Sequence, residues 1–328
     1  KFMATYKEIH GVKVQYRDSD ATAIEGDVWY NASTSKLKMY ASSGSWASGT
    51  NMNTKRGEGG GAGTATASLV IGGIAPPATV TEVESYDGST WTELADINTA
   101  RGITASGGTS TAAMIAGGGD PTTGKAETFD GSSWTETTDL STAGKLSGVG
   151  STTSLIAFAK GPPPSATNES WNGTSWTEVA DMNAVRYYAS GVGATGTAAL
   201  AVGGQTTSPA YVANVEQWDG TSWTALNALN TGRSTLGTAG TTTAALAFAG
   251  GSPFNTLGAL TEEFDGTSWA EVGDLATKRH AVTHNCQTQS ATTAYCTGGY
   301  NPPTSPTSWH NITEEWSFAA AVETVAFD

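Results

Sequence analysis

A six-residue signature, aromatic–Asp/Asn–Gly–x–x–Trp, occurs five times in this chain of 328 residues. Its tryptophans, together with one that precedes the first copy, follow each other at steps of 45, 43, 42, 47 and 46 residues. They are Trp46, Trp91, Trp134, Trp176, Trp223 and Trp269. Asp-Gly and Asn-Gly pairs supply the positive φ angles that tight hairpin turns require. Hairpin signals at a period in the forties predict one small β-sheet per period.

One repeat, residues 101–140, shows how such a sheet is built. We expect strands over residues 102–106, 112–116 and 126–129, and a fourth strand that begins at Trp134. Gly-rich and polar segments separate the first three, and Asp130-Gly131 forms the last turn. Each repeat is therefore predicted to be a four-stranded antiparallel meander.

Three further marks recur at fixed places in the repeats. A diglycine closes the second strand at Gly72, Gly117, Gly203, Gly250 and Gly298, whereas the third repeat has only Gly161 after Lys160. A glutamate precedes the third-strand aromatic by two positions, at Glu84, Glu127, Glu169, Glu216, Glu262 and Glu314. An arginine precedes the first strand at Arg56, Arg101, Arg186, Arg233 and Arg279, with Lys145 near the third equivalent. Because these residues recur together, we predict inter-blade packing for the tryptophans and ion pairs or backbone hydrogen bonds for the charged groups.

The combination of diglycine, Glu-x-aromatic and Trp resembles the kelch repeat over roughly residues 46–318. The resemblance implies an all-β fold, a β-propeller of kelch type. Six Glu-x-aromatic units are present, but the last one, at Trp316, has no tryptophan five positions on. The missing strand is predicted to come from the N-terminal segment around Trp46, so that the ring closes with six blades. Seven blades are the alternative, if residues 27–40 supply another sheet.

These expectations divide the chain into three parts. Residues 1–43 form an N-terminal β-hairpin or attachment segment, with a turn at residues 32–35. Residues 44–318 form the propeller, and residues 319–328 form a C-terminal strand or tail. Cys286 and Cys296 would face each other across a hairpin, either as a disulfide or as two free thiols.

Composition and motifs exclude several classes of function. The net charge is −14 and no basic run occurs, so we expect no nucleic-acid partner. No stretch approaches 18 apolar residues, so we expect no membrane insertion. The four histidines are not spaced as metal ligands, and no nucleophile, phosphate-loop or metalloprotease motif occurs. We therefore predict no catalytic residues, no metal and no cofactor.

The loops between the second and third strands differ in length and carry prolines and aromatic residues. Such loops on a rigid scaffold suit recognition. The candidate ligand- or partner-binding residues are Tyr211, Phe254, Tyr300, Trp309 and His310. The alternative is that these loops only join strands or contact neighbouring subunits.

A second resemblance lies at the N-terminus. The segments 3–9, 26–31 and 46–56 are similar to kelch-type proteins of tailed phages of marine bacteria, cyanobacteria especially, and the Gly26–Asn31 stretch is similar to phage tail-fibre segments. This resemblance implies a non-enzymatic virion protein, a tail fibre or surface appendage present in many copies or as a homo-oligomer, made in the host cytoplasm. Its partners would be other virion proteins and a host-surface glycan or protein. A capsid or tail decoration or scaffold protein is the first alternative, and a carbohydrate-active propeller enzyme, with a pair of carboxylates in the central funnel, is the second.

Overall fold

The computed structural model describes residues 15–17, 28–119, 121–206, 210–251, 258–283, 291–301 and 309–324. The chain divides into two compact units, one of Trp46–Ser317 and one of Lys1–Ser45 with Phe318–Asp328. None of the described residues belongs to a helix long and apolar enough to cross a membrane.

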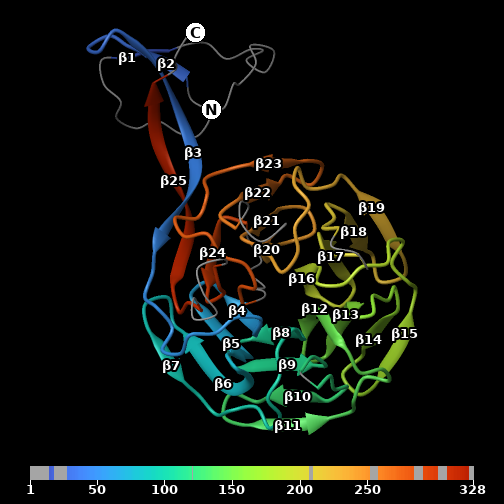
Figure 1. Cartoon of the computed structure of the whole chain (residues 1–328). Coiled ribbons are helices and arrows are strands. Elements are labelled where there is room, and N and C mark those ends of the chain that lie inside the picture. Colours follow the sequence, from blue (N-terminus) through green and yellow to red (C-terminus); the bar gives the residue numbers. More distant parts are fainter. Residues whose placement is uncertain are drawn as a thin grey trace. The chain divides into compact units, whose positions relative to one another are not determined.

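The larger unit is a six-bladed β-propeller, as the sequence predicted (Figure 1). Five blades are four-stranded antiparallel sheets whose strands follow chain order. Blade 1 contains β4 (Gly60–Thr64), β5 (Ala67–Ala75), β6 (Ala78–Tyr86) and β7 (Trp91–Glu93). Blade 2 contains β8 (Ala105–Thr109), β9 (Ala112–Ala116), β10 (Ala126–Phe129) and β11 (Trp134–Thr137). Blade 3 contains β12 (Lys145–Ser151), β13 (Ser154–Gly161), β14 (Asn168–Trp171) and β15 (Trp176–Val179). Blade 4 contains β16 (Ser190–Thr195), β17 (Ala198–Val202), β18 (Val215–Trp218) and β19 (Trp223–Leu226). Blade 5 contains β20 (Gly237–Gly240), β21 (Ala245–Phe248), β22 (Thr261–Phe264) and β23 (Trp269–Glu271).

The sixth blade is completed by the N-terminal segment, which confirms the predicted closure. Its described strands are β24 (Thr293–Thr297), β25 (Thr313–Thr324) and β3 (Lys36–Ser48), in the order β24-β25-β3. The ring centroids of Trp46 and Trp316 lie 5.4 Å apart, and the Gly49 amide donates to the Thr313 carbonyl at 2.9 Å. The seven-bladed alternative is wrong, because residues 28–40 extend this sixth sheet through β2 and β3 and do not build a sheet of their own.

Residue size explains the radial order of the strands. The first strand of each complete blade lies innermost and the fourth lies outermost (Figure 1). The inner strands are rich in Gly, Ala, Ser and Thr, which allows them to converge around the axis. The middle residues of the second strands are apolar and buried, and they pack against the third-strand aromatics of adjacent blades. Ile115, Phe129 and Trp134, for example, share a core cluster with Leu69 and Val83 of the preceding blade.

The smaller unit contains a short hairpin. β2 (Val28–Asn31) pairs with β3 in the register Val28↔Met39 to Asn31↔Lys36, which leaves residues 32–35 as the predicted turn. β1 (Gln15–Arg17) pairs with β2 in parallel, and β25 continues beside β3 as far as Thr324. The indole of Trp29 is fully buried.

Of the two cysteines, the structure describes only Cys296. Cys296 lies on β24 and is a buried thiol whose pKa is raised by burial to about 11. Cys286 lies outside the described residues, so a pairing of the two cysteines stays a prediction.

Candidate functional site

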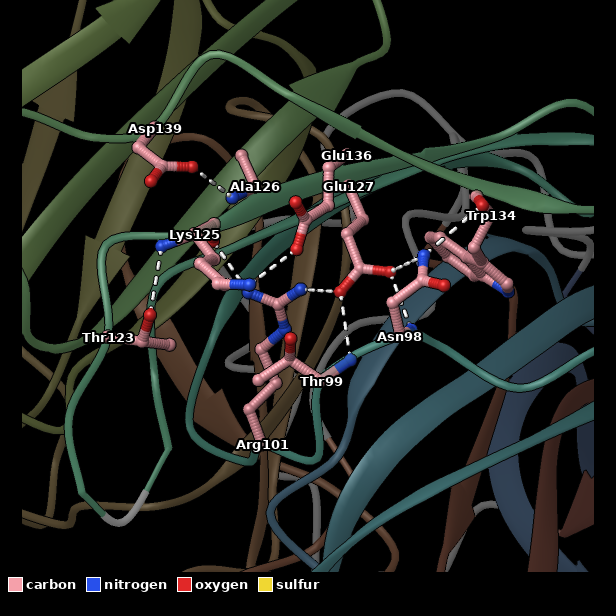
Figure 2. Close-up of polar contacts among 10 residues, drawn as sticks. All are labelled: Asn98, Thr99, Arg101, Thr123, Lys125, Ala126, Glu127, Trp134, Glu136 and Asp139. Atoms are coloured by element: carbon pink, nitrogen blue, oxygen red, sulfur yellow. Dashed lines mark hydrogen bonds and ion pairs between the residues drawn. The ribbon is translucent and has the colours of Figure 1, made fainter.

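The recurrent arginines and glutamates form buried ion pairs that tie each incoming connection to its own blade. Figure 2 shows the pair of blade 2, where the Arg101 guanidinium donates to Glu127. The other carboxylate oxygen of Glu127 accepts from the Asn98 amide at 2.7 Å and from its side chain at 2.8 Å. Equivalent pairs join Arg56 to Glu84, Arg186 to Glu216, Arg233 to Glu262 and Arg279 to Glu314. In these five blades the segment before the first strand is thereby fixed.

The residue two positions after each arginine adopts a left-handed backbone conformation. The φ angles are 55° at Glu58, 57° at Ile103, 56° at Tyr188, 50° at Thr235 and 53° at Ala281. Left-handed φ is unfavourable for a side chain with a Cβ, and most of all for a β-branched one. The chain accepts this conformation because it lets the residue hydrogen-bond to the next blade.

Four backbone hydrogen bonds link these residues and Leu146 from blade to blade. Glu58 donates its amide to the Ala281 carbonyl at 2.9 Å, and Ile103 donates to Glu58 at 2.7 Å. Leu146 donates to Ile103 at 3.1 Å, and Thr235 donates to Tyr188 at 3.1 Å. Each bond joins consecutive blades, so these residues surround the propeller axis. We call Glu58, Ile103, Leu146, Tyr188, Thr235 and Ala281 the axial ring.

Glu58 is the one ionisable carboxyl group of the axial ring. It is half-buried, and desolvation raises its pKa to about 7, although the nearby Lys145 opposes the shift. The group therefore changes charge near neutral pH, unlike an ordinary surface glutamate. Such a carboxyl group accepts hydrogen bonds when it is charged and can also donate one when it is protonated.

Aromatic side chains of blade 6 gather beside Glu58. The Tyr300 ring stacks on Trp309 with centroids 5.2 Å apart, and His280 meets Tyr300 edge-on at 4.0 Å. A Cβ on Gly57 would lie 2.7 Å from Cζ3 of Trp309, so the indole packs directly on the Gly57 backbone. Because Gly57 precedes Glu58, this contact places Trp309 next to the axial ring.

Blade 4 contributes a second group of rings. Tyr187 and Tyr188 meet edge-on with centroids 4.5 Å apart, and Tyr211 is bridged through Gln205 to the backbone of Tyr187. Burial raises the pKa of Tyr211, as does Tyr187. Burial also raises the pKa of Tyr300, together with the charges of Glu58 and Tyr211. The charge of Tyr187 thus acts on Tyr211, and the charges of Glu58 and Tyr211 act on Tyr300. We call the side chains of Glu58, Lys145, Tyr187, Tyr188, Tyr211, His280, Tyr300 and Trp309 the aromatic face.

The opposite face has a different character. There the short turns between first and second strands pack against the Asp-Gly turns, as Thr111 does against Gly131 and Thr243 against Gly266. These turns are polar and nearly the same in every complete blade. Variation between blades is concentrated on the aromatic face.

The structure brings some of the predicted contact residues together and leaves others apart or outside the described residues. Tyr300 and Trp309 come together, and the charge of Tyr211 acts on Tyr300. His310 is half-buried, its pKa is lowered by burial and by Arg279 and Lys55, and no ring contact joins it to Tyr300 in the described part of the chain. Phe254 lies outside the described residues.

Sequence reasoning did not select Glu58, Tyr187, Tyr188 or His280 as contact residues, and it named Lys145 only as lying near the third arginine position. Each lies one or two positions after the recurrent arginine or its equivalent, where the repeats differ most from one another. That variation inside an otherwise regular segment was the available signal. His280 keeps a neutral ring over the physiological range, because burial lowers its pKa to about 4.

Among the described residues, no three His, Cys, Asp or Glu side chains are arranged to hold a metal ion. No protein-family model matches the sequence, and no curated protein is significantly similar to it.

Proposed function

We propose that this protein is a non-enzymatic virion protein of a tailed phage, built as a kelch-type propeller in a tail fibre or surface appendage, and that its aromatic face recognises the host surface. The observation that carries the proposal is that two groups of half-buried rings, one from blade 4 and one from blade 6, lie beside the axial ring, which also carries Glu58. The kelch type and the phage origin rest on the sequence resemblances alone.

A surface glycan is the ligand that this set of side chains suits best. Indole and phenol rings offer flat apolar faces for the C–H side of a sugar, while tyrosine hydroxyls and a carboxyl group offer hydrogen-bond partners for its hydroxyls. Rings held by strand bridges lose little conformational entropy on binding. Ligand sites combine such apolar lining with a few placed polar groups.

The test is binding of the purified full chain to host cells and to isolated envelope polysaccharide. Trp309→Ala and Tyr211→Ala each remove a ring from the aromatic face, and each should weaken binding about tenfold or more. Thr243→Ala on the opposite face is the matched control and should bind as the wild type does. Equal binding by all variants, or normal attachment by phage that lack the protein, would refute the proposal.

The two alternatives predict other outcomes. A decoration or scaffold protein would show the aromatic face buried against virion neighbours in a map of the particle. A carbohydrate-active enzyme would turn over a polysaccharide and would need a second carboxyl group near Glu58. Glu58 is the single carboxyl group of the axial ring, so the enzyme alternative has less support than the binding function.

A further inference from the structure

Blade 3 differs from the other blades because it lacks the buried arginine. Glu169 pairs with Ala157 across the sheet as Glu216 pairs with Ala201 in blade 4, which aligns the two blades. Gly144 lies two positions before the axial-ring residue Leu146, as Arg101 lies before Ile103. Gly144 therefore occupies the arginine position.

In other blades the arginine head lies in a cradle of oxygen atoms. Arg233 donates to the Ala247 carbonyl at 3.3 Å, to the Leu260 carbonyl at 2.8 Å and to Glu262 at 3.0 Å. Arg279 donates to the Cys296 and Ile312 carbonyls at 3.1 and 2.8 Å and to Glu314 at 3.0 Å. The cradle thus consists of the glutamate carboxylate and two backbone carbonyls. One carbonyl belongs to the second-strand residue that pairs with the glutamate, and the other to the residue two positions before the glutamate.

Blade 3 retains this cradle around a cavity. The equivalent residues Ala157, Thr167 and Glu169 line a cavity of about 10 Å³, together with Leu140, Leu146, Phe158 and Lys160. This is room for about one water molecule, so a guanidinium group fits only once the Lys160 side chain has moved away. Glu169 is 8% exposed and accepts hydrogen bonds from the Ser141 amide at 2.8 Å and the Thr142 amide at 3.2 Å. The carboxylate is therefore held in the same orientation as its counterparts, facing the place of a guanidinium group.

Lys160 covers the path to this cavity without replacing the arginine. Its Cδ lies 2.7 Å from where a Cβ on Gly144 would be, so its stem passes over Gly144. Within the described part of the chain Lys160 forms no ion pair with Glu169. The side chain is half-buried and unbranched, so it can swing into solvent at small cost.

We propose that the cradle of blade 3 binds a guanidinium group supplied from outside the chain. A guanidinium ion presents planar, fixed N–H donors that match a carboxylate and flanking carbonyls, whereas an ammonium ion does not have that geometry. The pairs of blades 5 and 6 show that this arrangement of oxygens holds such a group in this fold. The ligand class is an alkylguanidine or the arginine side chain of a partner, and entry requires Lys160 to move aside.

The experiment is titration of the full chain with methylguanidinium chloride at constant ionic strength, followed by calorimetry and by thermal unfolding. We expect saturable binding, and a rise of roughly 2–4 °C in the unfolding midpoint at tenfold the dissociation constant. Lys160→Ala should tighten binding at least about threefold, because it opens the path and removes a competing positive charge. The double variant Gly144→Arg with Lys160→Gly rebuilds the internal pair and should bind none.

Three outcomes decide against the proposal. Equal binding by the wild type and the double variant would place the ligand elsewhere. Equal binding of methylammonium would show that the site reads charge only, and an absence of binding to Lys160→Ala would show that the cradle is closed. Because calorimetry measures binding directly, a change in stability of a variant does not hide the result.

A second probe distinguishes the two sources of the group. N-acetyl-arginine amide should bind at least as tightly as methylguanidinium if a partner's arginine is the natural occupant, and more weakly if the site takes only small alkylguanidines. Either result supports a guanidinium site.

Discussion

The buried Arg233–Glu262 pair illustrates how one residue type stabilises a blade. Both side chains are almost fully buried, and the guanidinium also satisfies three backbone carbonyls. Arg233→Met leaves a buried carboxylate without its cation, so we expect a loss of about 3–5 kcal/mol in the free energy of unfolding. Chemical denaturation with matched slopes measures this loss.

The exposed pair of Lys125 and Glu136 is the control for that prediction. Its nitrogen and oxygen lie 2.5 Å apart, but the side chains are 42% and 52% exposed, so water and salt screen their attraction. Lys125→Met should change stability far less than Arg233→Met does. Similar losses in the two variants would show that burial of the pair is not what matters.

Glu58 makes a pH-dependent contribution to stability that can be predicted in sign. Its pKa is about 7 in the folded chain against 4.5 for an ordinary glutamate, so the folded state binds more protons between these values. Folding should therefore be favoured more at pH 4 than at pH 8, and stability should fall as the pH rises through this interval. Glu58→Gln removes the titration, so the variant should gain about 1–3 kcal/mol relative to the wild type at pH 8 and little at pH 4. A difference between the two proteins that is constant from pH 4 to pH 8 would contradict the assignment.

The Asp-Gly turns are an element through which acid should weaken the blades. In blade 4 the Asp219 carboxylate accepts from the amides of Thr221 and Ser222, both at 2.8 Å. Such bonds lower the pKa of Asp219 and take that of Asp130 to about 2. The folded state then binds fewer protons than the unfolded chain. The stabilisation is present above about pH 4 and is lost as the pH falls through the folded pKa.

Blade 3 supplies the natural control for this prediction, because Asn172 makes the same two amide bonds at 2.9 Å without a charge. Replacing the four turn aspartates by asparagine should keep the fold at neutral pH and flatten the loss of stability between pH 4 and pH 2. Unfolding midpoints measured across that range test it. If the variant loses as much stability between pH 4 and pH 2 as the wild type does, other carboxylates cause the loss. The four aspartates are Asp87, Asp130, Asp219 and Asp265.

At the level of strands, alternation and turn chemistry predicted most of a blade. The expected strands at residues 112–116 and 126–129 coincide with β9 and β10. The expected first strand at 102–106 was wrong at both ends, because β8 runs from Ala105 to Thr109. It starts late because Ile103 adopts the left-handed φ that the axial ring needs. An isoleucine gives no local sign of that conformation, which the next blade imposes.

The diglycine register was also wrong in two blades. In each blade, one second-strand residue pairs with the recurrent glutamate, and the residue two positions after it has a left-handed φ. That residue is glycine in four blades, but it is Ala159 in blade 3 and Ala249 in blade 5. Lys160, and not Gly161, therefore occupies the second glycine position. Sequence alone favours glycine there, while the structure shows that hydrogen bonds between blades can hold alanine in this conformation.

The candidate site was predicted only in part, for a reason that belongs to the whole molecule. Tyr300 and Trp309 come from one loop, so loop composition was enough to single them out. Glu58 and Lys145 come from different blades and lie near each other only because six sheets converge on one axis. Which residues of different repeats come near each other depends on closure of the propeller, so the sequence of one repeat does not predict it.

Closure of the ring by β3 leads to the last prediction. β3 covers the outer edge of β25, and Trp46 packs on Trp316 and on Phe248 of blade 5. Removing residues 1–48 exposes the backbone groups of that edge, so the shortened chain should unfold at a lower temperature and self-associate as its concentration rises. Light scattering and thermal unfolding measure both effects. A peptide of residues 36–48 added in trans should reverse them, whereas the same peptide with Trp46→Ala should do so weakly. If the shortened chain stays monodisperse and keeps its unfolding midpoint, the N-terminal strand does not close the ring energetically, whatever its place in the sheet.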